Sequence, residues 1–200
     1  MPLRRTPCLI VFPFSAMVGV SVFAAPTGGA RAAEPFTLTS SAFADGGIIP
    51  KKYAGYHSSR KPPCGGENVS PPLAWSNAPA ATKTFAIVMQ DPDGGRGIGS
   101  NHWVAYDIPA TRTGLREGEA SVSPKEWVGG KNNVGTDYYF GPCGPAGDSP
   151  HHYIITLIAT SLEPGQMKPG LAREELLQAL RGKALAPATI VGKYVRGLEP

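Results

Sequence analysis

Charged residues are scarce in this chain, and neither sign dominates. Asp, Glu, Lys and Arg together make up 17% of the 200 residues, and the formal net charge is +4. Residues 1–33 hold three arginines and no acidic residue, so residues 34–200 carry 4 − 3 = +1. A net charge this small, with no basic stripe in which aromatic residues are interleaved, argues against a nucleic-acid partner.

A membrane-spanning segment is not evident either. The uncharged, largely apolar stretch from Cys8 to Ala25 is short for a spanning helix. It follows the Arg4-Arg5 pair and precedes the small-residue pattern Ala30-Arg31-Ala32, an arrangement typical of a secretory signal peptide. We therefore predict a cleaved signal peptide over residues 1–33, one domain over residues 34–200 and a periplasmic or secreted location. A membrane anchor is the alternative.

Cysteine occurs three times. Cys8 lacks the small residues before it that lipid attachment requires, so we do not expect a lipoprotein. Cys64 and Cys143 remain, and an even pair in an exported protein is a disulfide candidate. Such a bridge would close a loop of about 80 residues, worth roughly 4 kcal/mol in the chain-entropy model. Two free buried thiols are the alternative, and two cysteines alone are weak support for a metal site.

Glycine and proline are abundant, with 25 + 21 = 46 residues and no repeat. This composition indicates many short strands and turns. Apolar runs and apolar–polar alternation predict four strands, and a stripe of apolar residues at helical spacing, followed by Gly182, predicts one helix. The predicted strands cover residues 36–40, 84–89, 102–108 and 153–159, and the predicted helix covers residues 171–181. We expect a mainly β fold of two sheets with a helix near the C-terminus.

Ionisable side chains gather where the predicted strands begin or end. Asp91 and Asp93 follow one strand, with Pro92 between them, and His102 opens the next strand. His151 and Tyr153 open a later strand and share one face of it, because side chains alternate along a strand. Polar groups at strand ends flanked by glycine and proline are typical of a loop-built site on a rigid scaffold. A solvated turn and structural histidines are the alternative.

The sequence lacks the motifs that are typical of several catalytic and cofactor-binding sites. The glycine-rich loop Gly94–Gly99 is followed by neither Lys-Ser/Thr nor a helix, which argues against a nucleotide-binding loop. No Gly-x-Ser-x-Gly motif is present, and no nucleophile stands beside a histidine at recognisable spacing. Asp91, Asp93, His102 and His151 are chemically able to bind a metal, but no short ligand motif supports it. We predict no catalytic activity, no metal and no cofactor.

Taken in order, these segments resemble one family, the phosphatidylethanolamine-binding proteins, and within it the bacterial Raf-kinase-inhibitor-like branch. Residues 68–75 (NVSPPLAW) resemble its N-x-S-P-P-L-x-W signature. Asp91-Pro92-Asp93 with His102-Trp103 resembles its D-P-D…H-W pair, and residues 141–145 with His151-His152-Tyr153 resemble its G-P-C-P-P…H-x-Y segment. The resemblance runs from about Phe36 to Arg196.

The resemblance implies antiparallel sheets with a small anion pocket at one end. The pocket residues would be Asp91, Asp93, His102, Pro145, His151 and Tyr153, with Tyr194 in the tail as a weaker candidate. Histidine and tyrosine would donate hydrogen bonds to phosphate oxygens, and the carboxylates would orient the histidines or accept from an ammonium group. Two departures concern the pocket rim: Gly94-Gly95 replaces the family's Ala-Pro, and Gly144 replaces the first proline of a Pro-Pro pair.

The expected partner is therefore a small anionic or phosphorylated ligand, such as a phosphoethanolamine-like headgroup. A protein partner is the alternative, in which the chain acts as an interaction or inhibitor module and the pocket is vestigial or regulatory. A second copy of the chain in a homodimer is a further partner to consider. No stable membrane insertion is implied, because the mature chain has no basic amphipathic helix.

Overall fold

The computed structural model describes residues 34–56 and 64–197. The predicted signal peptide and Cys8 lie outside these residues, so that prediction remains untested. The elements, in chain order, are β1 (Thr37–Thr39), β2 (Gly47–Ile48), a 3-10 turn (Lys51–Tyr53), β3 (Leu73–Ser76), β4 (Thr84–Asp91), α1 (Gly94–Gly97), β5 (Ser100–Pro109), β6 (Gly114–Leu115), β7 (Val128–Gly129), β8 (His151–Thr160), α2 (Arg173–Ala179) and β9 (Ala184–Tyr194).

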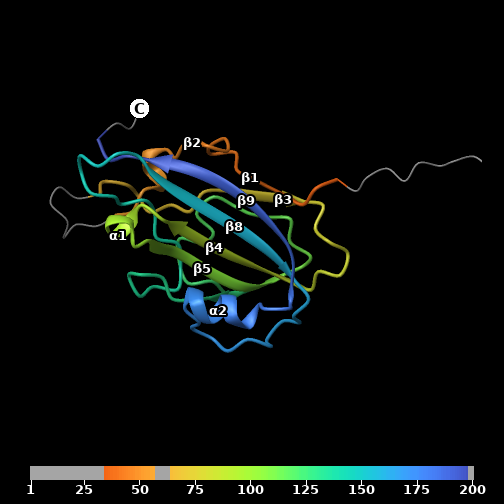
Figure 1. Cartoon of the computed structure of the whole chain (residues 1–200). Coiled ribbons are helices and arrows are strands. Elements are labelled where there is room, and N and C mark those ends of the chain that lie inside the picture. Colours follow the sequence, from red (N-terminus) through yellow and green to blue (C-terminus); the bar gives the residue numbers. More distant parts are fainter. Residues whose placement is uncertain (1–33, 57–63, 198–200) are drawn as a thin grey trace, which may run out of the picture. The chain divides into compact units, whose positions relative to one another are not determined.

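The strands form two sheets, as the sequence predicts. The larger sheet has the order β2-β9-β8-β4-β5-β7, and the smaller sheet has the order β1-β3-β6. All pairs are antiparallel except β2 with β9, which pair in parallel over two residues. Figure 1 shows the long strands β8, β9, β4 and β5 running side by side, with α2 beside this sheet. The prediction of a mainly β two-sheet fold is confirmed.

The large sheet is buried on both faces, which explains why β4 is apolar almost throughout. Phe85, Ile87 and Met89 point into the core between the two sheets. Ala86 and Val88 point to the opposite face, into a second cluster that α2 helps to cover. A strand covered on both sides has no position for a polar residue until it reaches the end of the sheet. Its first carboxylate is accordingly the last residue of the strand.

The helix α2 covers the outer face of the large sheet. Leu176 and Leu180 are buried in the second cluster, and Leu177 packs against that cluster from its edge. The helix ends near Leu180, and Gly182 adopts a left-handed φ of 69° just beyond it. The predicted role of this segment, packing against a sheet, is confirmed, although the helix is shorter than predicted. No helix in the described part of the chain is long and apolar enough to cross a membrane.

The longest strand, β9, was not predicted. Its first half carries alanines and Pro187, which are poor strand formers, and few of its side chains are apolar and bulky. Tertiary pairing overrides these preferences, because β9 lies against β8 along nearly its whole length. The disulfide between Cys64 and Cys143 is confirmed, with their Cα atoms 5.3 Å apart.

Candidate functional site

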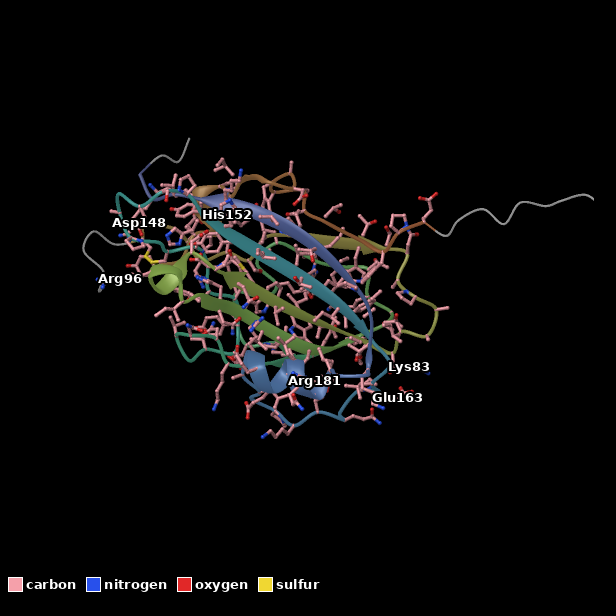
Figure 2. The ribbon with its side chains drawn as sticks, viewed as in Figure 1. Lys83, Arg96, Asp148, His152, Glu163 and Arg181 are labelled. Carbon is pink, nitrogen blue, oxygen red and sulfur yellow. A yellow bond between two sulfur atoms is a disulfide. The ribbon has the colours of Figure 1, made fainter. Side chains whose placement is uncertain are left out.

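The strand register brings the predicted polar residues to one end of the large sheet. Asp91, at the end of β4, pairs with Ser100 at the start of β5. His151, at the start of β8, pairs with Tyr194 at the end of β9. Figure 2 shows Arg96, Asp148 and His152 at this same end, whereas Lys83 and Glu163 lie at the opposite end. Residues that are up to a hundred positions apart in sequence therefore meet at one sheet edge.

The Asp91 carboxylate organises the turn that follows its own strand. Its Oδ1 accepts hydrogen bonds from the backbone N–H groups of Asp93 at 3.0 Å and Gly94 at 2.9 Å. Gly94 is required there, since an added Cβ would lie 2.9 Å from Asp91 Oδ2 and 2.8 Å from the Cβ of Ser100. This close approach accounts for a glycine where the resembled family has alanine. The buried carboxylate is thus held rigidly, with Oδ2 left for other partners.

His151 takes up the second oxygen of that carboxylate. Its Nδ1 lies 2.8 Å from Asp91 Oδ2, and both side chains are buried. Its Nε2 lies 3.5 Å from Oδ2 of the half-exposed Asp148. Burial alone would lower the pKa of His151, but the hydrogen bond and the negative charge of Asp91 outweigh it, so the pKa is raised. Asp91 therefore favours an imidazolium, whose Nε2–H faces the half-exposed Asp148 carboxylate at the mouth of the site.

His102 lies beside the same carboxylate but has the opposite electrostatic character. Its Nδ1 is 2.9 Å from the carbonyl oxygen of Phe140, so Nδ1 carries the proton, because a carbonyl can only accept. Its Nε2 is 3.9 Å from Asp91 Oδ2, too far for a direct hydrogen bond. Burial lowers the pKa of His102 despite the nearby acceptors. The neutral ring therefore presents an unprotonated Nε2 towards Asp91.

The two histidines are held by residues from distant parts of the chain. The Asn68 side chain donates to the carbonyl oxygen of Tyr139 at 3.0 Å and accepts from the N–H of Gly141 at 2.9 Å, which fixes the segment on either side of Phe140. The Phe140 ring stacks on His102 at 5.5 Å between ring centres. Asn68 is part of the N-x-S-P-P stretch singled out in the sequence, and its role here is to support the site.

A cavity of about 380 Å³ opens between these groups, and we call it the strand-end cavity. Four of the six predicted site residues line it, and several further residues do so without having been predicted as site residues. The predicted ones are Asp91, His102, Pro145 and His151; the others include Arg96, Ser100, Asn133, Val134, Phe140 and Gly144.

Asp93 and Tyr153 lie outside the cavity wall. Asp93 is half-exposed, and its Oδ2 accepts from the backbone N–H of His152 at 2.8 Å and lies 2.9 Å from that residue's Nδ1. These two hydrogen bonds lower the pKa of Asp93. Tyr153 is fully buried beneath the histidines, and its hydroxyl has no hydrogen-bond partner within the described residues. Burial and the charge of Asp91 raise the pKa of Tyr153, so its hydroxyl stays neutral.

Arg96 is the main site residue that the sequence did not single out. It lies in α1, which is an irregular turn rather than a helix, because Gly95 and Arg96 both have left-handed φ angles of 60° and 63°. Proline cannot adopt such an angle, which accounts for a glycine at position 95 where the resembled family has proline. A left-handed arginine is uncommon and costs on the order of 1 kcal/mol. In that conformation Arg96 lines the cavity.

The strand-end cavity offers both hydrogen-bond donors and acceptors. Arg96 and protonated His151 are its cationic residues, neutral His102 and Asp91 supply acceptors, and the half-exposed Asp148 carboxylate lies 3.5 Å from His151 Nε2. Among residues 34–56 and 64–197, no group of three or more His, Cys, Asp or Glu side chains is arranged to hold a metal ion.

Comparison with known proteins finds a matching family model and several similar sequences. A sequence model described as phosphatidylethanolamine-binding protein matches residues 39–195. A UPF0098 protein of Methanothermobacter thermautotrophicus is 36% identical over 162 residues, which cover 80% of this chain and 99% of the relative. A Mycobacterium tuberculosis protein named as a lipoprotein, LppC, is 36% identical over 172 residues, which cover 84% of this chain and 76% of that protein.

Two solved structures share the fold at more than 30% identity. The crystal structure of Escherichia coli YbcL, described as a member of the mammalian PEBP family, superposes with a TM-score of 0.72 at 31% identity and covers 80% of this chain and 98% of that one. The structure of CT736 from Chlamydia trachomatis, described as a homologue of phosphatidylethanolamine-binding protein, gives a TM-score of 0.67 at 31% identity, with 80% and 96% of the two chains covered.

Proposed function

The chain belongs to the phosphatidylethanolamine-binding protein family, and from that membership we propose that it binds a small phosphorylated or anionic ligand in the strand-end cavity. The observation that carries this proposal is the arrangement of two buried histidines on one carboxylate. Asp91 lies 2.8 Å from His151 and 3.9 Å from His102, and it raises the pKa of His151. An imidazolium donor in the same cavity as Arg96 suits phosphate oxygens.

We propose binding rather than catalysis for this cavity. The histidine rings of the described residues contact a carbonyl oxygen or carboxylates. No serine, threonine or cysteine side chain in residues 34–56 and 64–197 hydrogen-bonds to a histidine ring, so the usual activated nucleophile is missing there. The relatives in this family are named for binding, which agrees with the proposal.

The test is calorimetric titration of the full chain with inorganic phosphate and with phosphoethanolamine. His151→Ala removes the cationic donor, and His152→Ala is a matched control, because His152 is the next residue but points away from the cavity towards Asp93. Loss of a charge-assisted hydrogen bond of about 1.5–3 kcal/mol predicts a roughly 10- to 100-fold weaker affinity for His151→Ala and no change for His152→Ala.

Absence of binding by the parent protein would refute this function. The protein-interaction alternative would then gain weight, since Ile98, in the loop beside the cavity, is 91% exposed.

We also propose that the chain is exported. A buried disulfide and a relative named as a lipoprotein support this, and cell fractionation with an antibody against the domain would test it.

A further inference from the structure

A second hollow adjoins the strand-end cavity, and we call it the adjoining hollow. It measures about 310 Å³. Gly99, Ser100 and Asn133 line both spaces, so only the start of β5 and one loop residue separate them. The two spaces are therefore neighbours at this end of the large sheet.

Two cationic side chains line the adjoining hollow. Lys131 is exposed and has no ion pair within the described part of the chain. Arg173 makes one ion pair, from Nη1 to Glu174 Oε1 at 2.9 Å, and Glu174 also lines the hollow. Lys131 also helps to lower the pKa of Glu175, so that carboxylate lies near it. One carboxylate does not saturate the Arg173 guanidinium, which keeps donors for a second negative group.

The backbone anchors Lys131 beside the segment that leads into α2. The N–H of Lys131 donates to the carbonyl oxygen of Leu171 at 3.0 Å, and Lys131 forms an isolated parallel bridge with Ala172. Lys131 is therefore anchored directly next to the residue that precedes Arg173. The side chains of Lys131 and Arg173 therefore start from neighbouring stretches of backbone and both line the hollow.

The interior of the adjoining hollow is polar and incompletely hydrogen-bonded. Asn101 Oδ1 and Arg173 Nε are both buried and have no hydrogen-bond partner among residues 34–56 and 64–197. Both residues line the hollow. Unpartnered buried polar atoms are costly, so an occupant with its own donors and acceptors gains more here than an apolar one would.

We propose that the adjoining hollow binds a carboxylate of the ligand whose phosphate group occupies the strand-end cavity. The inference rests on the proposed function and narrows it to a phosphorylated compound that carries a carboxylate, with phosphoserine as the simplest example. The guanidinium of Arg173 offers two parallel donors for a carboxylate, and Lys131 adds a third donor. The same chemistry is present in a free phosphorylated acid and in a serine-bearing lipid headgroup.

O-phosphoserine and O-phosphoethanolamine differ only by one carboxylate, so their affinity ratio isolates the adjoining hollow. Calorimetric titration of the full chain should give roughly tenfold tighter binding of phosphoserine. In Lys131→Gln, Arg173→Gln double variants the ratio should fall to one, with the phosphoethanolamine affinity unchanged. Lys83→Gln is the matched control, because Lys83 lies at the opposite end of the domain (Figure 2), and it should keep the tenfold ratio.

Equal affinities of the parent protein for the two compounds would overturn this inference while leaving the strand-end cavity intact. Binding of neither compound would instead refute the cavity itself. Sedimentation with phosphatidylcholine vesicles containing either phosphatidylserine or phosphatidylethanolamine distinguishes the source. Stronger binding to phosphatidylserine vesicles than to phosphatidylethanolamine vesicles assigns a lipid headgroup as the ligand. A preference for phosphoserine over phosphoethanolamine without that difference between vesicles assigns a free phosphorylated acid.

Discussion

Replacing Asp91 by asparagine removes one negative charge 2.8 Å from His151 Nδ1 and keeps the size of the side chain. The amide oxygen can still accept from the N–H groups of Asp93 and Gly94, so the turn is preserved. The lost interaction is a charge-assisted hydrogen bond, worth about 1.5–3 kcal/mol. We therefore expect Asp91→Asn to lower the pKa of His151, because the carboxylate no longer stabilises the imidazolium.

Proton NMR titration of the histidine ring signals measures this shift directly. The chain has four histidines, and His151→Ala and His152→Ala assign two of the signals. In the parent protein His151 should titrate above about 6.5, its ordinary value. A midpoint at or below that value, or an unchanged midpoint in Asp91→Asn, would refute the role given to this carboxylate.

The same shift has consequences for binding and stability. Sulfate remains a dianion between about pH 5 and 9, so any pH dependence of its affinity comes from the protein. Affinity should fall as pH rises through the pKa of His151, and in Asp91→Asn the fall should begin at lower pH. A raised pKa also means that His151 contributes stability in full below about pH 6.5, and that this contribution is lost as pH rises through the folded-state value. His102 has a lowered pKa, so its protonation at acid pH costs stability and opposes the contribution of His151.

Three further variants test the scaffold. Replacing Cys64 and Cys143 by alanine opens a 79-residue loop and should lower the free energy of unfolding by about 4 kcal/mol in urea denaturation. Leu176→Ala, in the fully buried face of α2, should cost about 2–5 kcal/mol in the same assay. Gly94→Ala should displace the Asp91 carboxylate and weaken phosphate binding in calorimetry, and unchanged affinity would show that this close approach is unimportant.

Much of the site is predictable from sequence because it lies at strand ends. The apolar run of β4 indicates where the sheet stops, and Asp91 is the first charged residue after it. Alternation along β8 correctly separates buried His151 and Tyr153 from exposed His152. However, alternation does not predict how far below the cavity a buried side chain lies. Tyr153 lies about 7 Å further along the strand than His151, which places its hydroxyl beneath the cavity rather than in its wall.

The features of the site that the sequence did not predict depend on irregular backbone. Arg96 reaches the cavity only because two consecutive residues adopt left-handed φ angles, and nothing in a glycine-rich loop specifies which residues do so. Phe140 belongs to a segment without regular structure, positioned by the Asn68 side chain from 72 residues earlier in the chain. Asp93 is turned outwards by the hydrogen bonds that Asp91 makes within the turn. Such features follow from side-chain to backbone hydrogen bonds, for which composition and periodicity give no signal.

The opposite pKa shifts of the two histidines suggest a finer selectivity. Protonated His151 donates and neutral His102 accepts, so the best ligand is an anion that still carries one O–H group. Methyl phosphate is such an anion below its second pKa of about 6, whereas methyl sulfate is a monoanion without a proton. At pH 5.5 we expect methyl phosphate to bind about 2- to 10-fold more tightly, the worth of one neutral hydrogen bond. Equal calorimetric affinities at that pH would show that His102 does not accept from the ligand, and the site would then be selective for charge alone.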